Sequence, residues 1–250
     1  VHGEQPVAPE AEEKYLNWIR QRAEHIPLQQ LTGEQGFMGL TFSVNEHVLI
    51  PRQDTEILVE EVLKELHDGM RVLDMCTGSG CILLSLLHYS NDCEGLGVDL
   101  SAEALEVAGR NVLKVLTPEK AEHAHFLQSD LFEKVEGKFE IIVSNPPYIA
   151  SAEVEKLMPE VRDHEPRMAL DGTEDGLYFY RRIIEEAGKH LVSSGMLFFE
   201  IGYDQGQAVS ELMRTEGYCE VQVVQDYAGL DRVVFGTYVT VQPAPFAKSR

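Results

Sequence analysis

The chain has 250 residues, 44% of them hydrophobic and 25% charged, a balance typical of a folded globular protein with room for one α/β domain. Acidic side chains outnumber basic ones by 42 to 21, and the net charge of −21 argues against nucleic acid as the main partner, because phosphates are repelled. No apolar run approaches the roughly 18 residues that cross a bilayer, so no membrane partner is expected.

The first part of the chain alternates between helical and strand-like periodicity. Three elements are predicted there: a helix over residues 14–25, a β-ribbon over residues 36–50 and a helix over residues 55–67. Pro27 closes the first helix, and Gly39 and Asn45 are turn signals within the ribbon. These elements precede the main domain.

From residue 71 onward, strands alternate with helices. Strands are expected over residues 71–74, 95–99, 123–128, 139–144 and 196–201, and helices over 80–87, 102–116, 176–192 and 205–215. Two final strands, 220–226 and 232–238, have no helix between them, which indicates an antiparallel hairpin at the sheet edge. The pattern predicts an α/β fold with a doubly wound, mostly parallel seven-stranded sheet. The predicted units are residues 1–25, 26–69, 70–239 and a flexible tail, 240–250.

A glycine loop follows the first strand of this domain, with the sequence Asp74-Met75-Cys76-Thr77-Gly78-Ser79-Gly80. Ligands of open α/β sheets bind beyond the carboxyl ends of the strands, where glycines let the backbone approach closely. A nicotinamide-binding fingerprint would need a third glycine where this chain has Leu83. The Asp74 carboxylate would repel a pyrophosphate but suits a sulfonium cofactor with a cationic amino-acid end. A tight strand-to-helix turn without a ligand is the alternative.

Acidic side chains also follow the next two strands. Asp99 ends the second strand, where a carboxylate can accept hydrogen bonds from two ribose hydroxyls. After the third strand, the Asp130 carboxylate could accept a hydrogen bond from the exocyclic amine of an adenine, and Leu131 could pack on the adenine ring. Each aspartate could instead cap a helix or turn. Together these residues favour S-adenosylmethionine as the cofactor, bound by Cys76, Thr77, Gly78, Ser79, Gly80, Asp99, Asp130 and Leu131.

The fourth strand runs into the most specific motif of the chain, Asn145-Pro146-Pro147-Tyr148. Two prolines fix the backbone and remove two N–H donors, so the carbonyl oxygens of Asn145 and Pro146 are free for a ligand. Together with the Asn145 side chain they suit a planar NH2 group, and Tyr148 offers an aromatic face. An amide nitrogen is a poor nucleophile, so catalysis would come mainly from placing it in line with a sulfonium methyl. The four residues are predicted to be catalytic; a rigid Pro-Pro turn is the alternative.

The cysteines give no sign of a metal site. Cys76, Cys81, Cys93 and Cys219 form no Cys-x-x-Cys pair and have no histidine at ligand spacing, so neither zinc nor a disulfide framework is indicated. Buried thiols in a reducing compartment are the simpler interpretation, and a cytoplasmic location is expected.

With these motifs the chain resembles the class I methyltransferases with an Asn-Pro-Pro-Tyr motif, and within them the HemK/PrmC family of peptide chain release factor glutamine methyltransferases. The distinguishing stretches are residues 27–33, 37–44 and 48–56. Further matches are Asp171-Gly172, Gly176-Leu177, Glu200-Ile201-Gly202, Asp226-Tyr227 and Asp231-Arg232. The resemblance covers roughly residues 15–238.

The resemblance implies a class I, Rossmann-like methyltransferase fold and methyl transfer to the glutamine amide of the Gly-Gly-Gln motif of release factors, which would be the protein partners. The residues from Cys76 to Gly80, with Asp99, Leu131 and Asn145, would line the cofactor, and Asn145 to Tyr148 would hold the glutamine. Cys76 stands where the family usually has glycine. Residues 1–25 would supply only the last helix of the family's N-terminal helical domain.

Two points stay open at this stage. The segment from Ile50 to Glu56 is either a simple strand-to-helix corner or places Arg52, Thr55 or Glu56 over the methionine end of the cofactor. The enzyme could also be a nucleic-acid methyltransferase acting on an adenine or guanine amine, because a flipped base presents the same NH2 geometry. That alternative requires a basic groove or a target-recognition insert, and the chain has neither. A cofactor-binding module without catalysis is a third hypothesis. The intact clamp, which is the motif from Asn145 to Tyr148, disfavours it.

Overall fold

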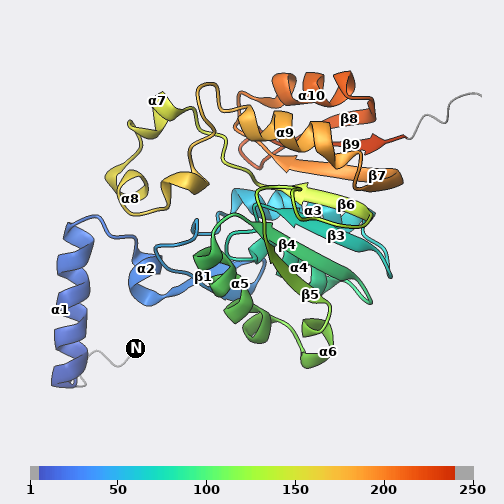
Figure 1. The fold of residues 1–250 in the computed structure, drawn as a ribbon. Coiled ribbons are helices and arrows are strands. Elements are labelled where there is room, and N and C mark those ends of the chain that lie inside the picture. The colour runs from blue at the N-terminus through green and yellow to red at the C-terminus, as the bar shows by residue number, and fades with distance from the viewer. Residues whose placement is uncertain (1–5, 240–250) are drawn as a thin grey trace, which may run out of the picture.

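The computed structural model describes residues 6–239 and is built around a seven-stranded sheet in the order β5-β4-β3-β6-β7-β9-β8 (Figure 1). The strands are β3 (Arg71–Met75), β4 (Glu94–Asp99), β5 (Ala124–Gln128), β6 (Phe139–Ser144), β7 (Leu191–Glu200), β8 (Tyr218–Gln225) and β9 (Asp231–Tyr238). β3 to β7 are parallel, whereas β9 runs antiparallel to both β7 and β8. The predicted fold is confirmed, including the antiparallel hairpin at the edge.

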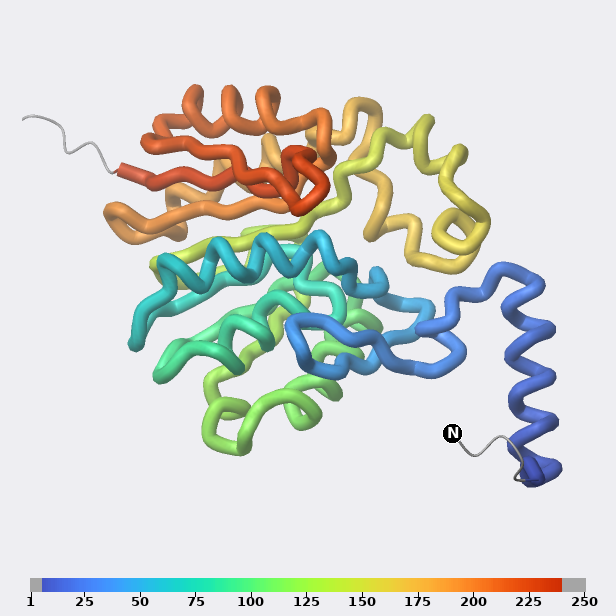
Figure 2. The backbone as a smooth tube through the Cα atoms, turned by 180° about the vertical axis from the view of Figure 1, so that it is seen from behind, coloured from blue at the N-terminus to red at the C-terminus, as the bar shows by residue number. Residues whose placement is uncertain are grey.

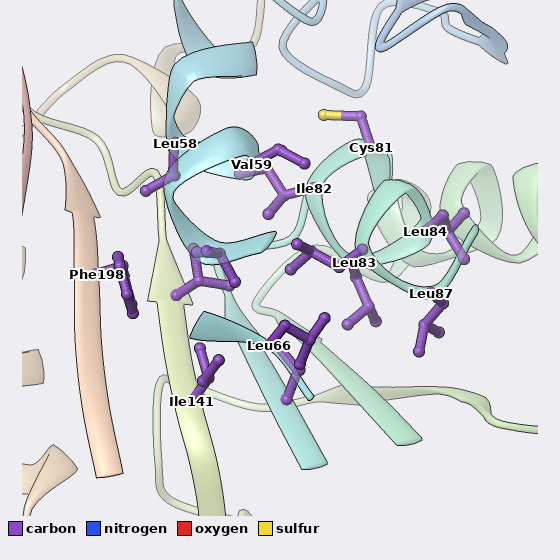
Figure 3. Close-up of a cluster of buried hydrophobic side chains, with 14 of the residues drawn as sticks. Leu58, Val59, Leu66, Cys81, Ile82, Leu83, Leu84, Leu87, Ile141 and Phe198 are labelled. Carbon is purple, nitrogen blue, oxygen red and sulfur yellow. The ribbon is translucent and has the colours of Figure 1, made fainter. Parts of the chain in front are cut away.

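Helices cover both faces of this sheet. They are α3 (Asp54–Glu65), α4 (Cys81–Tyr89), α5 (Ala102–Val115), α9 (Tyr178–Ala187) and α10 (Gly206–Thr215). Successive strand residues point to opposite faces, so Ile141 packs in one cluster with α3 and α4, while Ile142 packs in the other with α9 and α10. Figure 3 shows the first cluster, where Leu58, Leu83 and Phe198 are fully buried. These two hydrophobic clusters hold the helices against the sheet and thereby position the loops at the edge where the parallel strands end.

The residues before α3 form a separate group of elements. They are α1 (Pro9–Ala23), α2 (Leu28–Thr32), β1 (Glu34–Phe37) and β2 (Leu40–Ser43). α1 stands beside the body of the molecule and has no buried residue (Figures 1 and 2). The hairpin of β1 and β2 docks on α5, where the buried Asn111 side chain accepts from the N–H of Ser43 at 2.7 Å and donates to its carbonyl at 3.0 Å. Whether residues 1–25 belong to a separate domain stays a prediction.

Several predicted boundaries differ from the structure. The β-ribbon expected over residues 36–50 begins at Glu34 and ends at Ser43, and residues 44–50 are irregular. The helix expected over residues 176–192 is shorter, since α9 ends at Ala187 and β7 begins at Leu191, which pairs with Phe139. Apolar residues in this strand continued the helical pattern, so periodicity alone did not separate the two elements.

Short helices in the connections were not predicted. They are α6 (Pro118–Ala121), α7 (Ser151–Val154), α8 (Pro159–Arg162) and the 3-10 helix η1 (Arg167–Ala169). The last three lie between β6 and α9, and Arg22 of α1 meets Glu160 of α8 at 2.9 Å. The predicted tail, residues 240–250, lies outside the described residues. Within residues 6–239, no helix is both long and apolar enough to cross a membrane.

Candidate active site

A cavity of about 340 Å³ opens at the edge where the parallel strands end. Its walls come from the loops after β3, β4, β5 and β6, from the segment that leads into α3, and from the segment around η1. Of the predicted site residues, the following line it: Cys76, Thr77, Gly78, Ser79, Asp99, Asp130, Leu131, Asn145 and Pro147. Gly80, Pro146 and Tyr148 do not. The size is that of a small-molecule site.

The glycine loop after β3 forms one wall through tight local turns. The N–H of Thr77 donates to the carbonyl of Val98 at 3.0 Å, and the N–H of Gly80 donates to the carbonyl of Thr77 at 2.9 Å. Gly80 has a φ of 78° and caps α4, and an added Cβ would lie 3.2 Å from the Cβ of Ala108. Gly80 therefore shapes the turn and the packing behind the cavity, while its neighbours line the cavity itself.

Cys76 adopts a backbone conformation that favours glycine, with a φ of 62°. A side chain in this left-handed region costs about 1 kcal/mol. Cys76→Gly is therefore expected to raise the free energy of unfolding by about 0.5–1 kcal/mol, measured by urea denaturation without cofactor. Cys76→Ala keeps the Cβ and should give no such gain. Equal stabilisation by both variants would contradict an origin in backbone strain.

Asp74 lies behind the same loop and is fully buried, but it does not line the cavity. Its Oδ2 accepts from the Thr77 hydroxyl at 2.6 Å and from the N–H of Leu83 at 3.3 Å, while Oδ1 has no partner among the described residues. Burial raises its pKa to about 7. Asp74 thus braces the loop from behind.

The raised pKa of Asp74 predicts a pH-dependent stability. Between the unfolded pKa near 4 and the folded pKa of about 7, the folded state holds a proton that the unfolded state lacks, so stability falls as pH rises. Asp74→Asn removes this loss. Relative to the unsubstituted protein, the variant should gain on the order of 2 kcal/mol between pH 5.5 and 8, by urea denaturation without cofactor. An unchanged difference at the two pH values would contradict this expectation.

Two carboxylates line the cavity beyond the loop. Asp99 accepts from the N–H of Gly78 and from the N–H of Ser101, each at 2.9 Å, and burial raises its pKa. Its position is thereby fixed, and each oxygen still has a second lone pair for a ligand hydroxyl. Asp130 pairs with Arg182 at 2.9 Å, and the adjoining Leu131 is a buried apolar wall with a φ of 47°.

The Asn-Pro-Pro-Tyr motif follows β6 and is held from several sides. Asn145 faces the cavity, and its Nδ2 lies 3.4 Å from the Thr55 hydroxyl. The Tyr148 hydroxyl lies 3.5 Å from Oε1 of the buried Glu200, and the Tyr148 carbonyl accepts from Gln205 at 3.0 Å. Asn145 thus lines the cavity, whereas the partly exposed Tyr148 is not among the lining residues, and the role of its ring toward the substrate stays a prediction.

Two glycines press directly on the backbone of this motif. A Cβ added to Gly172 would lie 2.8 Å from the Pro147 carbonyl oxygen, and one added to Gly176 would lie 2.3 Å from the Tyr148 carbonyl oxygen. The N–H of Gly172 donates to the carbonyl of Ile149 at 2.8 Å. These contacts give the physical reason for glycine at both positions.

A second part of the cavity wall was not predicted from the sequence, apart from Arg52 and Thr55, whose role had stayed open. It consists of His47, Val48, Leu49, Pro51, Arg52 and Thr55 before and within the start of α3, and of Pro166, Met168, Ala169, Asp171 and Phe179. The buried Glu165 joins the two parts, because it binds the Arg52 guanidinium and accepts from the N–H of Ile50 at 3.1 Å. Glu56 instead accepts from the N–H of Met38 at 2.6 Å. The segment from Ile50 to Glu56 therefore supplies Arg52 and Thr55 to the cavity.

Comparisons with known proteins show the family to which this chain belongs. Residues 52–161 match the family described as Methyltransferase small domain. A release factor glutamine methyltransferase of Clostridium acetobutylicum is 44% identical, over 88% of this chain and 78% of the relative. One of Moorella thermoacetica is 45% identical, over 92% of this chain and 81% of the relative. A solved methyltransferase of Pyrococcus furiosus shares the fold, with a TM-score of 0.59 at 18% identity, over 88% of this chain and 99% of that chain. The chain belongs to the family of release factor glutamine methyltransferases.

Proposed function

We propose that this protein transfers a methyl group from S-adenosylmethionine to the side-chain amide nitrogen of the glutamine in the Gly-Gly-Gln motif of peptide chain release factors. The observation that carries the proposal is the placement of the Asn145 amide in a cavity whose other walls suit the cofactor, in a chain whose relatives are named for this reaction. The fixed Asp99 carboxylate suits the ribose hydroxyls, and the Leu131 wall suits an adenine ring.

The residues of the clamp act on the glutamine amide by orientation. When bound, S-adenosylmethionine supplies an electrophilic methyl group. The Asn145 side-chain oxygen accepts one of the two amide hydrogens, which helps to turn the nitrogen lone pair toward the cofactor end of the cavity. Holding the nitrogen in line replaces the strong base that an amide would otherwise need, and its proton is released after the methyl group has been transferred.

The alternative, transfer to an adenine or guanine amine of a nucleic acid, is not favoured. The relatives at 44% and 45% identity are named glutamine methyltransferases, and the net charge of −21 opposes a phosphate backbone. The intact cavity and clamp likewise support an active enzyme over a module that only binds the cofactor.

Tritium transfer from labelled S-adenosylmethionine tests the proposal. Three acceptors are compared: a bacterial release factor, the same factor with the glutamine of its Gly-Gly-Gln motif changed, and a mixed pool of DNA and tRNA. Label on the intact factor alone is expected. Label on the changed factor would move the methylated position elsewhere, and label on the nucleic acids would establish the alternative.

A further inference from the structure

A single aromatic side chain contributes to the wall of the cavity. Of the Phe, Tyr and Trp residues that the structure describes, only Phe179 is among the lining residues. It lies in the first turn of α9 and is partly buried. The residues assigned so far to the cofactor and to the clamp do not include it. A ring that stays partly open to a cavity of this size is available to a flat ligand.

Contacts of α9 hold the Phe179 ring in place. The Tyr178 ring meets it edge to face, with the ring centroids 5.1 Å apart and the planes at 83°. The guanidinium carbon of Arg182 in turn lies 5.8 Å from the centroid of the Tyr178 ring. Phe179 also packs against the hydrophobic cluster that includes Leu131 and Phe132. The ring therefore has fixed neighbours before any ligand binds.

An ion pair joins α9 to the loop after β5. Nη1 of Arg182 donates to Oδ1 of Asp130 at 2.9 Å, which leaves the second carboxylate oxygen of Asp130 to a ligand in the cavity. Residues three apart in a helix share a face, so Phe179 and Arg182 point to the same side of α9. The Phe179 ring therefore lies toward the end of the cavity that Asp130 and Leu131 form.

The two ends of the cavity suit different chemical groups. In the sheet, β4 and β3 stand between β5 and β6, so the loops after β5 and β6 are separated by about 14 Å at the usual strand spacing. The clamp with Asn145 follows β6, and the acceptor glutamine belongs at that end. An adenine is flat and carries an exocyclic amine, and it therefore matches the aromatic ring and the free carboxylate oxygen at the end formed by the loop after β5.

We propose that Phe179 is a binding residue that packs its ring against the adenine of S-adenosylmethionine. Arg182 is the positioning residue of this subsite, because it holds both Asp130 and the first turn of α9 at this end of the cavity. The inference rests on the proposed function, since it identifies the part of the cofactor that this end recognises.

Binding of S-adenosylhomocysteine, measured by calorimetry, tests the Phe179 ring. Phe179→Ala is expected to raise the dissociation constant about 10- to 100-fold, the usual effect of removing an aromatic partner of a base. Phe179→Leu keeps an apolar side chain and should raise it about three- to ten-fold, whereas Phe179→Tyr keeps the ring and should change it less than about three-fold. Equal dissociation constants for Phe179→Leu and Phe179→Tyr would overturn the assignment of the ring.

The turnover number separates the adenine from the acceptor. With S-adenosylmethionine saturating, Phe179→Leu should methylate a release factor with a kcat within about three-fold of the original, because a contact made equally in the ground state and the transition state affects KM alone. A lower kcat together with an unchanged dissociation constant for S-adenosylhomocysteine would place the Phe179 ring on the acceptor and overturn the proposal.

A purine with a different exocyclic group tests Arg182. Hypoxanthine has a carbonyl oxygen where adenine has its amine, so S-inosylhomocysteine cannot donate to Asp130 from this position. Arg182→Met is expected to narrow the preference for S-adenosylhomocysteine about three- to ten-fold, whereas Arg182→Lys keeps a cation and most of the preference. Arg181→Met is the matched control, because Arg181 pairs with Asp175 at 2.8 Å and neither residue lines the cavity. Equal effects of Arg181→Met and Arg182→Met would overturn the positioning role.

Failure of the inference and failure of the proposed function are distinguishable. Binding of S-adenosylhomocysteine that depends on Phe179, without label on a release factor in any preparation, would refute the proposed acceptor and support the adenine subsite. Label on the release factor with a dissociation constant that Phe179→Ala leaves unchanged would refute the subsite alone. Thermal unfolding of each variant identifies preparations that do not fold, and if Phe179→Ala is one of them, the comparison of Phe179→Leu with Phe179→Tyr still decides the question.

Discussion

Asn145→Ala is expected to lower kcat for methylation of a release factor by about 10²–10³-fold, the usual cost of removing one preorganised hydrogen-bond group from a reacting centre. Asn145 faces the cavity, and within residues 6–239 its side chain makes only one hydrogen bond, a long one of 3.4 Å to Thr55. Its removal should therefore spare the fold. Single-turnover methyl transfer, with cofactor affinity measured separately by calorimetry, checks this expectation.

Asn145→Asp is the matched control for this prediction. An aspartate keeps an acceptor oxygen at the same position, so it should retain more activity than alanine. If the acceptor is the required feature, the order of kcat is asparagine, then aspartate, then alanine. An alanine variant with more than about a tenth of the original kcat would contradict the clamp as described here.

Gly176→Ala is expected to damage both stability and turnover. Gly176 has a φ of 72°, and an added Cβ would lie 2.3 Å from the Tyr148 carbonyl oxygen and 2.9 Å from Nε2 of Gln205. Because the clash is with backbone, relief requires the Asn-Pro-Pro-Tyr segment to move. We expect a loss of about 2–4 kcal/mol in the free energy of unfolding, together with a fall in kcat of at least about ten-fold.

Gly217→Ala separates the clash from the backbone conformation. Gly217 has a φ of 88°, and nothing lies within 4 Å of an added Cβ. The control should cost only about 1 kcal/mol and leave turnover unchanged. Urea denaturation and methyl transfer are measured on both variants. Equal effects of the two substitutions would show that contact with Tyr148 is not what requires glycine at residue 176.

Much of the fold could be predicted because local pattern and topology agree. The strands from β3 to β6 are short apolar runs separated by helices of clear periodicity, and this alternation permits few sheet topologies. The limits of α9 could not be predicted in the same way. The apolar residues after α9 are compatible with both a helix and a strand. They form a strand because Leu191 pairs with Phe139, a residue that is distant in sequence.

The residues of the candidate site also fall into a group that could be predicted from the sequence and a group that could not. Residues that directly follow a strand, such as Asp99 and Asn145, reach the cavity because the sheet puts strand ends together. The wall around Met168 could not be foreseen, since its loop is placed by the contact of Glu165 with Arg52 and by an isolated β-bridge between Ile149 and Asp171. The contact of the Tyr148 hydroxyl with Glu200 likewise joins residues that are distant in sequence, so local sequence does not reveal it.

The antiparallel insertion of β9 between β7 and β8 has a consequence for synthesis on the ribosome. The loops after β3 to β6 that line the cavity emerge with residues 71–147, whereas Glu200 and Gln205, which contact Tyr148, emerge much later. Even then β7 has an open edge until Asp231–Tyr238 pairs with it. In a nascent chain, the contacts of Glu200 and Gln205 with Tyr148 therefore form only after the loops that follow β3 to β6 have been made.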